Sequence, residues 1–322
     1  MNKRTNIFII NPHHYCYSTA ALFEGLGKID SVKVFSNSFQ NYAPLCNVAS
    51  QLNSQLKLAK ASDIVVLAHS ALEAKYNDII GPLLSEVEVD VFLDGSDHRP
   101  YVSDPSKYKL YLKRELDPTQ LKHYDNVVPF EFAAEDRFFS NGRNRSHLNM
   151  WRNKDIDLVC MMGIGECPWR VDIMEDLKKK YGEPSDRFFI GPYHEDPKKQ
   201  KIDTEGRHNV GYFTNLRRSK ISVAAYGAGE CRQTGRFWES LAAGCLIFYQ
   251  PIEPFVWSTP YIDKEHVVIY NNNDELLDKA DYYIGHPQEA EKIAKNAYNL
   301  MLKSGQTLNR AQEFLSVVEE YL

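Results

Sequence analysis

The sequence has no apolar run long enough to cross a membrane. Its 322 residues contain no window of about 18 apolar residues, the length that a membrane span requires. A charged start is followed by the short apolar run 7–10 and then at once by Asn11 and Pro12, so we expect no signal peptide. These absences predict a cytoplasmic protein without a transmembrane segment, for which peripheral contact with a membrane stays open.

Cysteine motifs, low-complexity tracts and an excess of positive charge are also missing. None of the 6 cysteines stands in a Cys-x-x-Cys pair, which argues against a zinc ribbon or a redox motif and predicts free thiols. With 17 Gly and 15 Pro, the chain is neither collagen-like nor of low complexity. The 38 Lys and Arg against 43 Asp and Glu give a net charge of −5, which argues against a general nucleic-acid coat.

Short apolar runs alternate with helical stretches along the chain. The predicted strands are 7–10, 32–35, 63–68, 89–93, 126–130, 156–162, 187–191, 221–226, 245–248 and 266–270. The predicted helices are 19–26, 47–59, 77–86, a polar helix before 126, and then 170–181, 234–243, 273–284, 287–303 and 307–322. Nearly continuous apolar strands separated by helices are typical of a parallel sheet covered on both faces. The sequence therefore predicts an α/β protein with two doubly wound, Rossmann-like halves.

The two halves meet at a polar, aperiodic stretch around 143–147. We expect an N-terminal domain over 1–150, a C-terminal domain over 151–304 and a last helical segment over 305–322. Two such halves put a cleft between them, and ligands of open α/β sheets bind outside the carboxyl ends of the strands. The loops after the strands are therefore where functional residues are expected.

The segment with the most candidate ligand-binding residues follows the third predicted strand of the second half. Its glycine-rich turn contains Gly229 and Arg232, and Thr234 stands where the N-cap of the next helix is expected. Backbone N–H groups at a helix N-terminus, together with Arg236 in the first turn, suit a diphosphate. Glu239 follows three residues later, where its carboxylate can accept from two ribose hydroxyls. The alternative is an ordinary solvated Arg–Glu pair.

The run from Arg236 to Gly244 resembles the donor-binding helix of GT-B glycosyltransferases, and it is similar to the variants in spore-coat-type glycosyltransferases and bacteriophage DNA β-glucosyltransferase. The resemblance implies that Glu239 binds the nucleotide ribose and Arg236 the donor diphosphate. It also implies a last helix that returns to the first domain. The 111–116 segment is similar to one in spore-coat-type enzymes, with no role assigned. Eight residues, rather than the seven of many retaining enzymes, separate Glu230 from Glu239, which favours an inverting enzyme.

The strand at 89–93 is followed by two carboxylates, Asp94 and Asp97, and then by Arg99. An inverting sugar transfer needs a base that takes the proton of the acceptor hydroxyl. By similarity to the phage enzyme, Asp94 is the first candidate base and Asp97 the second, and Arg99 is an acceptor-side candidate. The alternative is an Asp-Gly turn capped by its own side chain. The spacing of the two carboxylates is one residue too long for an Asp-x-Asp metal site, so we expect no metal.

The loop after the first strand offers a third candidate base, His13, because an imidazole ordinarily titrates near neutral pH. His14 and Tyr15 follow at once, and an aromatic ring there can stack on a sugar. They are acceptor-side candidates. The alternative is an exposed polar loop.

The loop after the first strand of the second half contains Gly163 and Gly165, which let a ligand approach the backbone closely. The third glycine of a dinucleotide fingerprint is missing. GT-B enzymes use this loop around the donor diphosphate, and Arg170 opens the helix that follows it. Lys220 precedes a later strand, and its position in a GT-B fold implies contact with phosphate. A solvated helix end is the alternative for Lys220.

These residues and the resemblance together predict a glycosyltransferase. We expect it to move a sugar from a nucleotide-diphosphate sugar to a hydroxyl acceptor, with inversion and without a metal or other cofactor. A surface glycan, polysaccharide or lipid-linked glycan is the expected acceptor, and a hydroxylated base in DNA is the alternative. A non-catalytic sugar-nucleotide-binding protein is the alternative outside the enzymes.

Overall fold

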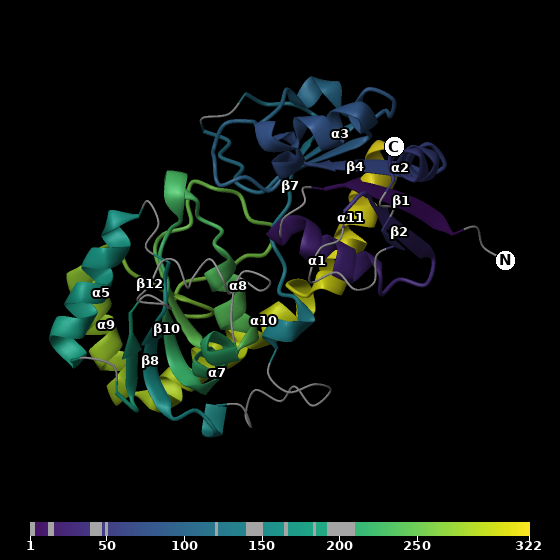
Figure 1. The fold of residues 1–322 in the computed structure, drawn as a ribbon. Helices are drawn as coiled ribbons and strands as arrows, with labels where there is room; N and C mark the ends of the chain where they lie inside the picture. The colour runs from purple at the N-terminus through teal and green to yellow at the C-terminus, as the bar shows by residue number, and fades with distance from the viewer. Residues whose placement is uncertain are drawn as a thin grey trace. The chain divides into compact units, whose positions relative to one another are not determined.

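The computed structural model describes residues 4–11, 16–38, 47–48, 51–119, 122–139, 151–163, 167–182, 185–191 and 210–322. The chain forms two compact units, each with its own sheet (Figure 1). Unit 1 contains residues 1–135, 254–258 and 306–322, and unit 2 contains residues 136–253 and 259–305.

Unit 1 is built on seven parallel strands in the order β3-β2-β1-β4-β5-β6-β7. The strands are β1 (Thr5–Ile10), β2 (Val32–Ser36), β3 (Asn47–Val48), β4 (Ile64–Ala68), β5 (Val91–Asp94), β6 (Leu110–Lys113) and β7 (Val127–Pro129). The helices are α1 (Tyr17–Leu26), α2 (Leu52–Lys60), α3 (Asn77–Leu84) and α11 (Thr307–Tyr321). The chain places β2 and β3 on one side of β1 and places the later strands, from β4 on, on the other side. The strand order therefore reverses between β1 and β4.

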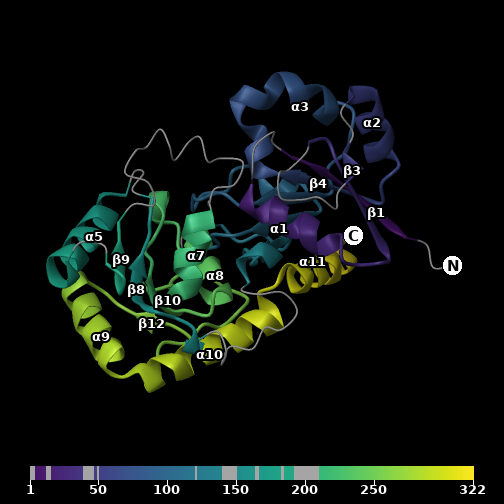
Figure 2. The same ribbon diagram turned by 60° about the horizontal axis from the view of Figure 1, so that its bottom comes forward.

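Apolar side chains of these strands alternate between the two faces of the sheet. Ile7 and Ile9 pack with residues of α1 and α11, whereas Phe8 and Ile10 pack with residues of α2 and α3. Figure 2 shows the two pairs of helices on opposite sides of the sheet. Strands covered on both faces need apolar residues at successive positions, which explains the nearly continuous runs in the sequence.

The structure corrects two expectations within unit 1. Residues 110–113 form β6, where the sequence indicated a polar helix before residue 126. The strand has only four residues and ends in Lys113, a charged side chain that is fully buried, so its apolar signal is weak. The second helix begins at Leu52, after β3, and not at residue 47.

Unit 2 is built on five parallel strands in the order β12-β11-β10-β8-β9. The strands are β8 (Ile156–Cys160), β9 (Phe188–Ile190), β10 (Ser219–Val223), β11 (Leu246–Tyr249) and β12 (Val268–Ile269). The helices are α5 (Pro168–Tyr181), α7 (Val210–Arg218), α8 (Gly235–Ala242), α9 (Asn273–Gly285) and α10 (Pro287–Ser304). The chain places β9 on one side of β8 and places the later strands, from β10 on, on the other side. The strand order of this sheet therefore reverses between β8 and β10.

The second sheet is also covered on both faces. Leu158 and Cys160 of β8 pack with residues of α5 and α9, whereas Val159 and Met161 pack with residues of α7. Helix α7, which the sequence did not indicate, shares its face of the sheet with α8 (Figures 1 and 2). Both units therefore confirm the expected doubly wound α/β class. Among the helices of the described residues, none has the length and apolar character of a membrane span.

The close packing of α11 on α1 in unit 1 depends on Gly25. A Cβ atom at Gly25 would lie 2.0 Å from the carbonyl oxygen of Thr307 and 2.8 Å from the Cβ atom of Ala311. Lys28, which follows α1, also links α1 to α11, because its ammonium donates to the Thr307 hydroxyl at 2.7 Å. Gly81 of α3 provides a contrast, since a Cβ atom there would meet no atom within 4 Å.

We predict that Gly25→Ala lowers the free energy of unfolding by about 1–3 kcal/mol, the usual cost of overpacking, because the α11 backbone must move away. Gly81→Ala is the matched control and should raise this free energy by up to about 1 kcal/mol, because alanine favours the helix. Urea unfolding followed by circular dichroism measures both variants. Equal effects of the two substitutions would contradict the close contact between α1 and α11.

Candidate functional site

One side chain ties together the loops that follow β8 and β10 in unit 2. Arg170, in the first turn of α5, donates to the carbonyl oxygens of Gly163 at 2.7 Å, Tyr226 at 2.8 Å and Ala225 at 3.3 Å. These loops flank the point where strand order reverses, the usual ligand-binding edge of an open α/β sheet. A Cβ atom at Gly163 would meet no other atom within 4 Å, so there is space beside this backbone. Arg170 shapes the edge through its backbone contacts, and its expected contact with a diphosphate stays a prediction.

The N-terminus of α8 lies at the same edge. Thr234 is the N-cap residue, but its hydroxyl pairs with the Tyr249 hydroxyl at 3.0 Å and caps no backbone N–H. The guanidinium carbon of Arg232 lies 3.4 Å from the centre of the Tyr226 ring, a cation–π contact. Gly229 has a φ of 63°, in the left-handed region that favours glycine. These contacts give the turn before α8 a defined conformation.

Glu239 and Arg236 pair with each other within α8. Nη1 of Arg236 lies 3.3 Å from Oε2 of Glu239, and 1% of the Glu239 side chain is exposed. The hydroxyl of Tyr212, from α7, donates a hydrogen bond to the same Oε2. The Arg236 guanidinium lies over the Tyr212 ring, 4.3 Å from its centre. The pair is therefore buried and held by a third side chain, unlike the solvated pair that the sequence left open.

Positive charge gathers near the end of β8. Burial raises the pKa of the Cys160 thiol to about 12, and the guanidinium groups of Arg236 and Arg170 act in the opposite direction. Burial also raises the pKa of the Tyr212 hydroxyl, Arg236 opposes that rise and Glu239 adds to it. Tyr212 therefore keeps its proton and acts as a donor. Two fixed guanidinium groups at the N-termini of two helices suit an anionic ligand.

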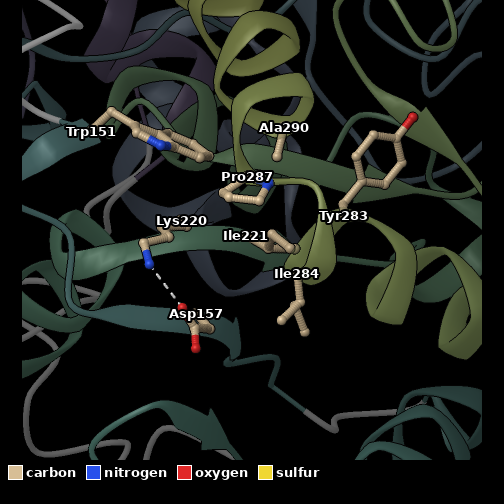
Figure 3. A pocket seen from close by; sticks show the side chains of 8 residues that line it. All are labelled: Trp151, Asp157, Lys220, Ile221, Tyr283, Ile284, Pro287 and Ala290. Atoms are coloured by element: carbon tan, nitrogen blue, oxygen red, sulfur yellow. Dashed lines mark hydrogen bonds and ion pairs between the residues drawn. The ribbon is translucent and has the colours of Figure 1, made fainter.

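Lys220 lies at the other end of the same sheet. It is the second residue of β10, and its ammonium forms an ion pair with Asp157 of β8 at 2.9 Å (Figure 3). Tyr226 follows six positions later, roughly 20 Å along an extended chain. The pocket beside Lys220 has a cavity volume of about 20 Å³, which is room for a single water molecule. The structure thus separates Lys220 from the loops that contain the other donor-binding candidates.

Asp94, the first candidate base in unit 1, is fully buried at the end of β5. Its Oδ2 accepts from the Tyr111 hydroxyl at 2.6 Å and lies 3.1 Å from the Lys113 ammonium, and its Oδ1 accepts from the Ser96 hydroxyl at 2.6 Å. Burial alone would raise the pKa of the Asp94 carboxyl, but these partners outweigh burial and hold the pKa below its usual value. In this conformation the carboxylate has no exposed surface from which to take a proton from an acceptor.

Asp97, the second candidate base, faces solvent from the same loop. Its side chain is 56% exposed, and its carboxylate pairs with the buried guanidinium of Arg114. Arg114 also donates to the carbonyl oxygen of Ser96 at 2.7 Å, and Lys113 donates to that of His98 at 2.7 Å. The end of β6, to which the sequence assigned no role, therefore holds the loop after β5 and fixes the position of Asp97.

His69, which the sequence analysis did not single out, lies beside this loop. It is the first residue of the 3-10 helix His69–Leu72 that follows β4, and its Nδ1 accepts the backbone N–H of Gly95 at 3.1 Å. Burial lowers the pKa of His69 to about 4, although Asp94 acts in the opposite direction. The imidazole is therefore neutral at pH 7 and carries its proton on Nε2, as a hydrogen-bond donor. Its place directly after a buried strand was the signal that could have identified it.

The other candidates of unit 1 are only partly within the described residues. The guanidinium of Arg99 lies 5.1 Å from the centre of the Phe255 ring and 3.5 Å from Oδ2 of Asp117, so it braces the loop after β5. His13, His14 and Tyr15 fall outside the described residues, and so does Gly165 of unit 2. Across the part of the chain that the structure describes, no three His, Cys, Asp or Glu side chains gather in a way that could hold a metal ion.

Comparisons with known proteins point to one kind of enzyme. A family model described as glycosyl transferase-like matches residues 171–316. A glycosyltransferase from Rickettsia africae has a similar structure, with a TM-score of 0.67 and 13% identity over 100% of this chain and 99% of that one. Anabaena HepE in complex with UDP-glucose gives a TM-score of 0.65 and 10% identity over 98% and 100% of the two chains. An alpha-glucosyltransferase in complex with UDP and a mismatched 13-mer DNA gives 0.61 and 11% over 99% and 100%. No curated protein matches the sequence.

The chain has the GT-B fold, and its second half matches a glycosyl transferase-like family. The family match begins within α5 and ends within α11, so it contains both Arg236 and Glu239. The sequence also missed Tyr212, the partner of Glu239. Tyr212 lies in a helix that no sequence pattern indicated, and nothing in the sequence separates it from an ordinary core tyrosine. The contact with Glu239 appears only in the folded chain.

The neutral state of His69 makes the stability of the protein depend on pH. The pKa of His69 in the folded protein, about 4, lies below its ordinary value of 6.5. The neutral imidazole therefore contributes fully to the free energy of unfolding above pH 6.5, and this contribution is lost as the pH falls from 6.5 to 4. We predict that His69→Gln reduces the loss of unfolding free energy between pH 7 and pH 4.5 by about 2 kcal/mol, because glutamine does not titrate.

Urea unfolding at each pH measures this effect. His123→Gln, at an exposed histidine outside the network, is the control variant. A pH profile of His69→Gln that runs parallel to the wild-type profile would show that this histidine is not held in the neutral form.

Proposed function

We propose that this protein is a glycosyltransferase that transfers a sugar from a UDP-sugar to a hydroxyl acceptor, and that unit 2 binds the donor. The observation that carries the proposal is the buried Arg236–Glu239 pair at the start of α8. It lies at the edge of the sheet where Arg170 ties two loops together. The uridine nucleotide is supported by two of the similar structures, which were solved with UDP-glucose and with UDP.

A nucleoside diphosphate offers two kinds of group to such a site. Its phosphates are anionic, and a helix N-terminus with a guanidinium in its first turn stabilises them by charge-assisted hydrogen bonds. Its ribose offers hydroxyl donors to the carboxylate of Glu239. Negative charge grows on the leaving diphosphate as the sugar departs, and the same fixed positive groups stabilise it. In this proposal they take the place of a metal ion.

We predict that UDP raises the melting temperature of the wild type, that EDTA leaves this shift unchanged and that Glu239→Ala abolishes it. A ligand that binds only the folded state stabilises it by mass action, and Glu239 supplies the ribose contact. A thermal-shift panel of nucleoside diphosphates measures this, with Glu289→Ala, at an exposed residue of α10, as the control. A shift that survives in Glu239→Ala would contradict the donor site, and a shift that EDTA removes would contradict the metal-independent mechanism.

We further propose that unit 1 supplies the groups that act on the acceptor. Asp97 is the exposed carboxylate of the loop after β5, and we assign to it the role of base in an inverting transfer. Asp94 supports the loop from inside, and the Nε2–H of His69 is a donor for an acceptor or sugar hydroxyl. His13 stays the alternative base.

Asp97→Asn should lower kcat by about 100-fold or more and leave UDP affinity unchanged, because the base acts only on the acceptor proton. Asp94→Asn should instead lower the free energy of unfolding by about 3 kcal/mol, because the Lys113 ammonium loses its buried partner. Transfer from radiolabelled UDP-glucose measures the first effect, and proton NMR of the product gives its anomeric configuration. Full activity of Asp97→Asn, or a product that keeps the configuration of the donor, would contradict the inverting mechanism.

The proposed acceptor is a glycan, a polysaccharide or a lipid-linked glycan, and the last of these would bring peripheral contact with a membrane. A hydroxylated base in DNA is the second candidate, because a similar structure was solved with UDP-glucose and DNA. A DNA acceptor predicts binding that weakens steeply with salt. Donor binding with no transfer to any acceptor in a panel that contains both classes would instead indicate a non-catalytic sugar-nucleotide-binding protein.

A further inference from the structure

The hydroxyl of Tyr212 joins the two donor-binding candidates of α8 from a different helix. It donates to Oε2 of Glu239, the oxygen that also faces Nη1 of Arg236 at 3.3 Å. The ring of the same tyrosine lies under the Arg236 guanidinium. Tyr212 is 0% exposed, so solvent does not compete for its hydroxyl. One buried side chain therefore contacts both the carboxylate and the guanidinium.

We propose that Tyr212 is a positioning residue that makes the enzyme selective for ribonucleotides over deoxyribonucleotides in its donor. This inference rests on the proposed binding of a UDP-sugar by unit 2. A hydroxyl that keeps its proton is a donor of fixed direction, and it holds the Glu239 carboxylate in one orientation. Without it, Arg236 alone still holds this oxygen, and the carboxylate is free to turn away from the ribose. The ribose hydroxyls then lose their acceptor.

The ring and the hydroxyl of Tyr212 have separable effects in this proposal. The hydroxyl acts on Glu239, and therefore on the ribose. The ring acts on Arg236 through a cation–π contact, and therefore on the diphosphate. Tyr212→Phe removes only the hydroxyl, whereas Tyr212→Leu removes both. The two variants should differ in which part of the nucleotide they stop recognising.

The experiment is a set of dissociation constants measured by isothermal titration calorimetry with UDP, 2′-deoxy-UDP, 3′-deoxy-UDP and UMP. A hydrogen bond to a charged group is worth about tenfold or more in affinity, so the wild type should prefer UDP over one of the deoxy analogues by at least that factor. In Tyr212→Phe this preference should fall to that of Glu239→Ala, while the preference for UDP over UMP stays as in the wild type. In Tyr212→Leu both preferences should fall.

Tyr181→Phe is the matched control. Tyr181 is another tyrosine of unit 2 that donates to a carboxylate, that of Asp281 at 2.7 Å, on a contact between α5 and α9. Its loss should leave the preference for UDP over the deoxy analogues unchanged. If Tyr212→Phe keeps the wild-type preference while Glu239→Ala loses it, the role of Tyr212 is wrong and the donor site stands. If the wild type binds no UDP, or Glu239→Ala keeps the preference, the proposed donor site fails and the role of Tyr212 fails with it.

A second comparison applies if Tyr212→Phe does not fold. Glu239→Leu removes the carboxylate, so Tyr212→Phe added to it leaves no buried carboxylate without its hydroxyl donor. The double variant should bind UDP with the same dissociation constant as Glu239→Leu alone, because the hydroxyl acts only through the carboxylate. A further loss of affinity in the double variant would overturn the proposal.

Discussion

The need to pair every buried charge governs the candidate sites of this protein. Both sheets are covered on two faces, so a charged group at a strand end is stable inside only if partners satisfy it. Asp94 meets this need with Lys113, Tyr111 and Ser96. Glu239 meets it with Arg236 and Tyr212. Each network lies close to a loop that follows a parallel strand, which is where such sheets bind ligands.

In both units a buried carboxylate lies close in the chain to a charged side chain that is more exposed. Asp94 is buried, whereas Asp97 in the same loop is 56% exposed and anchored by Arg114. The Glu239 side chain is 1% exposed, whereas the Arg236 side chain is 17% exposed. Asp94 fixes the loop on which Asp97 stands. Glu239 and Tyr212 hold the Arg236 guanidinium in one direction, and a charge that is already oriented lowers the cost of binding an anion.

The fold class and several site residues followed from the sequence for a clear reason. Apolar runs that are buried on both faces are visible without any knowledge of their neighbours, and so are the polar residues that follow them. Arg236 and Glu239 stood out because their spacing on one helix is a local property. Helix α7 and strand β6 did not stand out. The signal of β6 is cut short by Lys113, a buried charge that makes sense only beside Asp94.

By itself the sequence determined two doubly wound halves, the loops that follow their strands and the spacing of Arg236 and Glu239 on α8, which resembles a donor-binding helix. Tertiary structure decided which polar side chains are buried and which are exposed to solvent. It buried Asp94, the first candidate base, and left Asp97, the second, exposed. It also placed Lys220 at the far end of its sheet and brought His69 and Tyr212 into the two networks. The physical reason is that burial and hydrogen bonding join residues far apart in the chain. Residue type and spacing describe only neighbours along it.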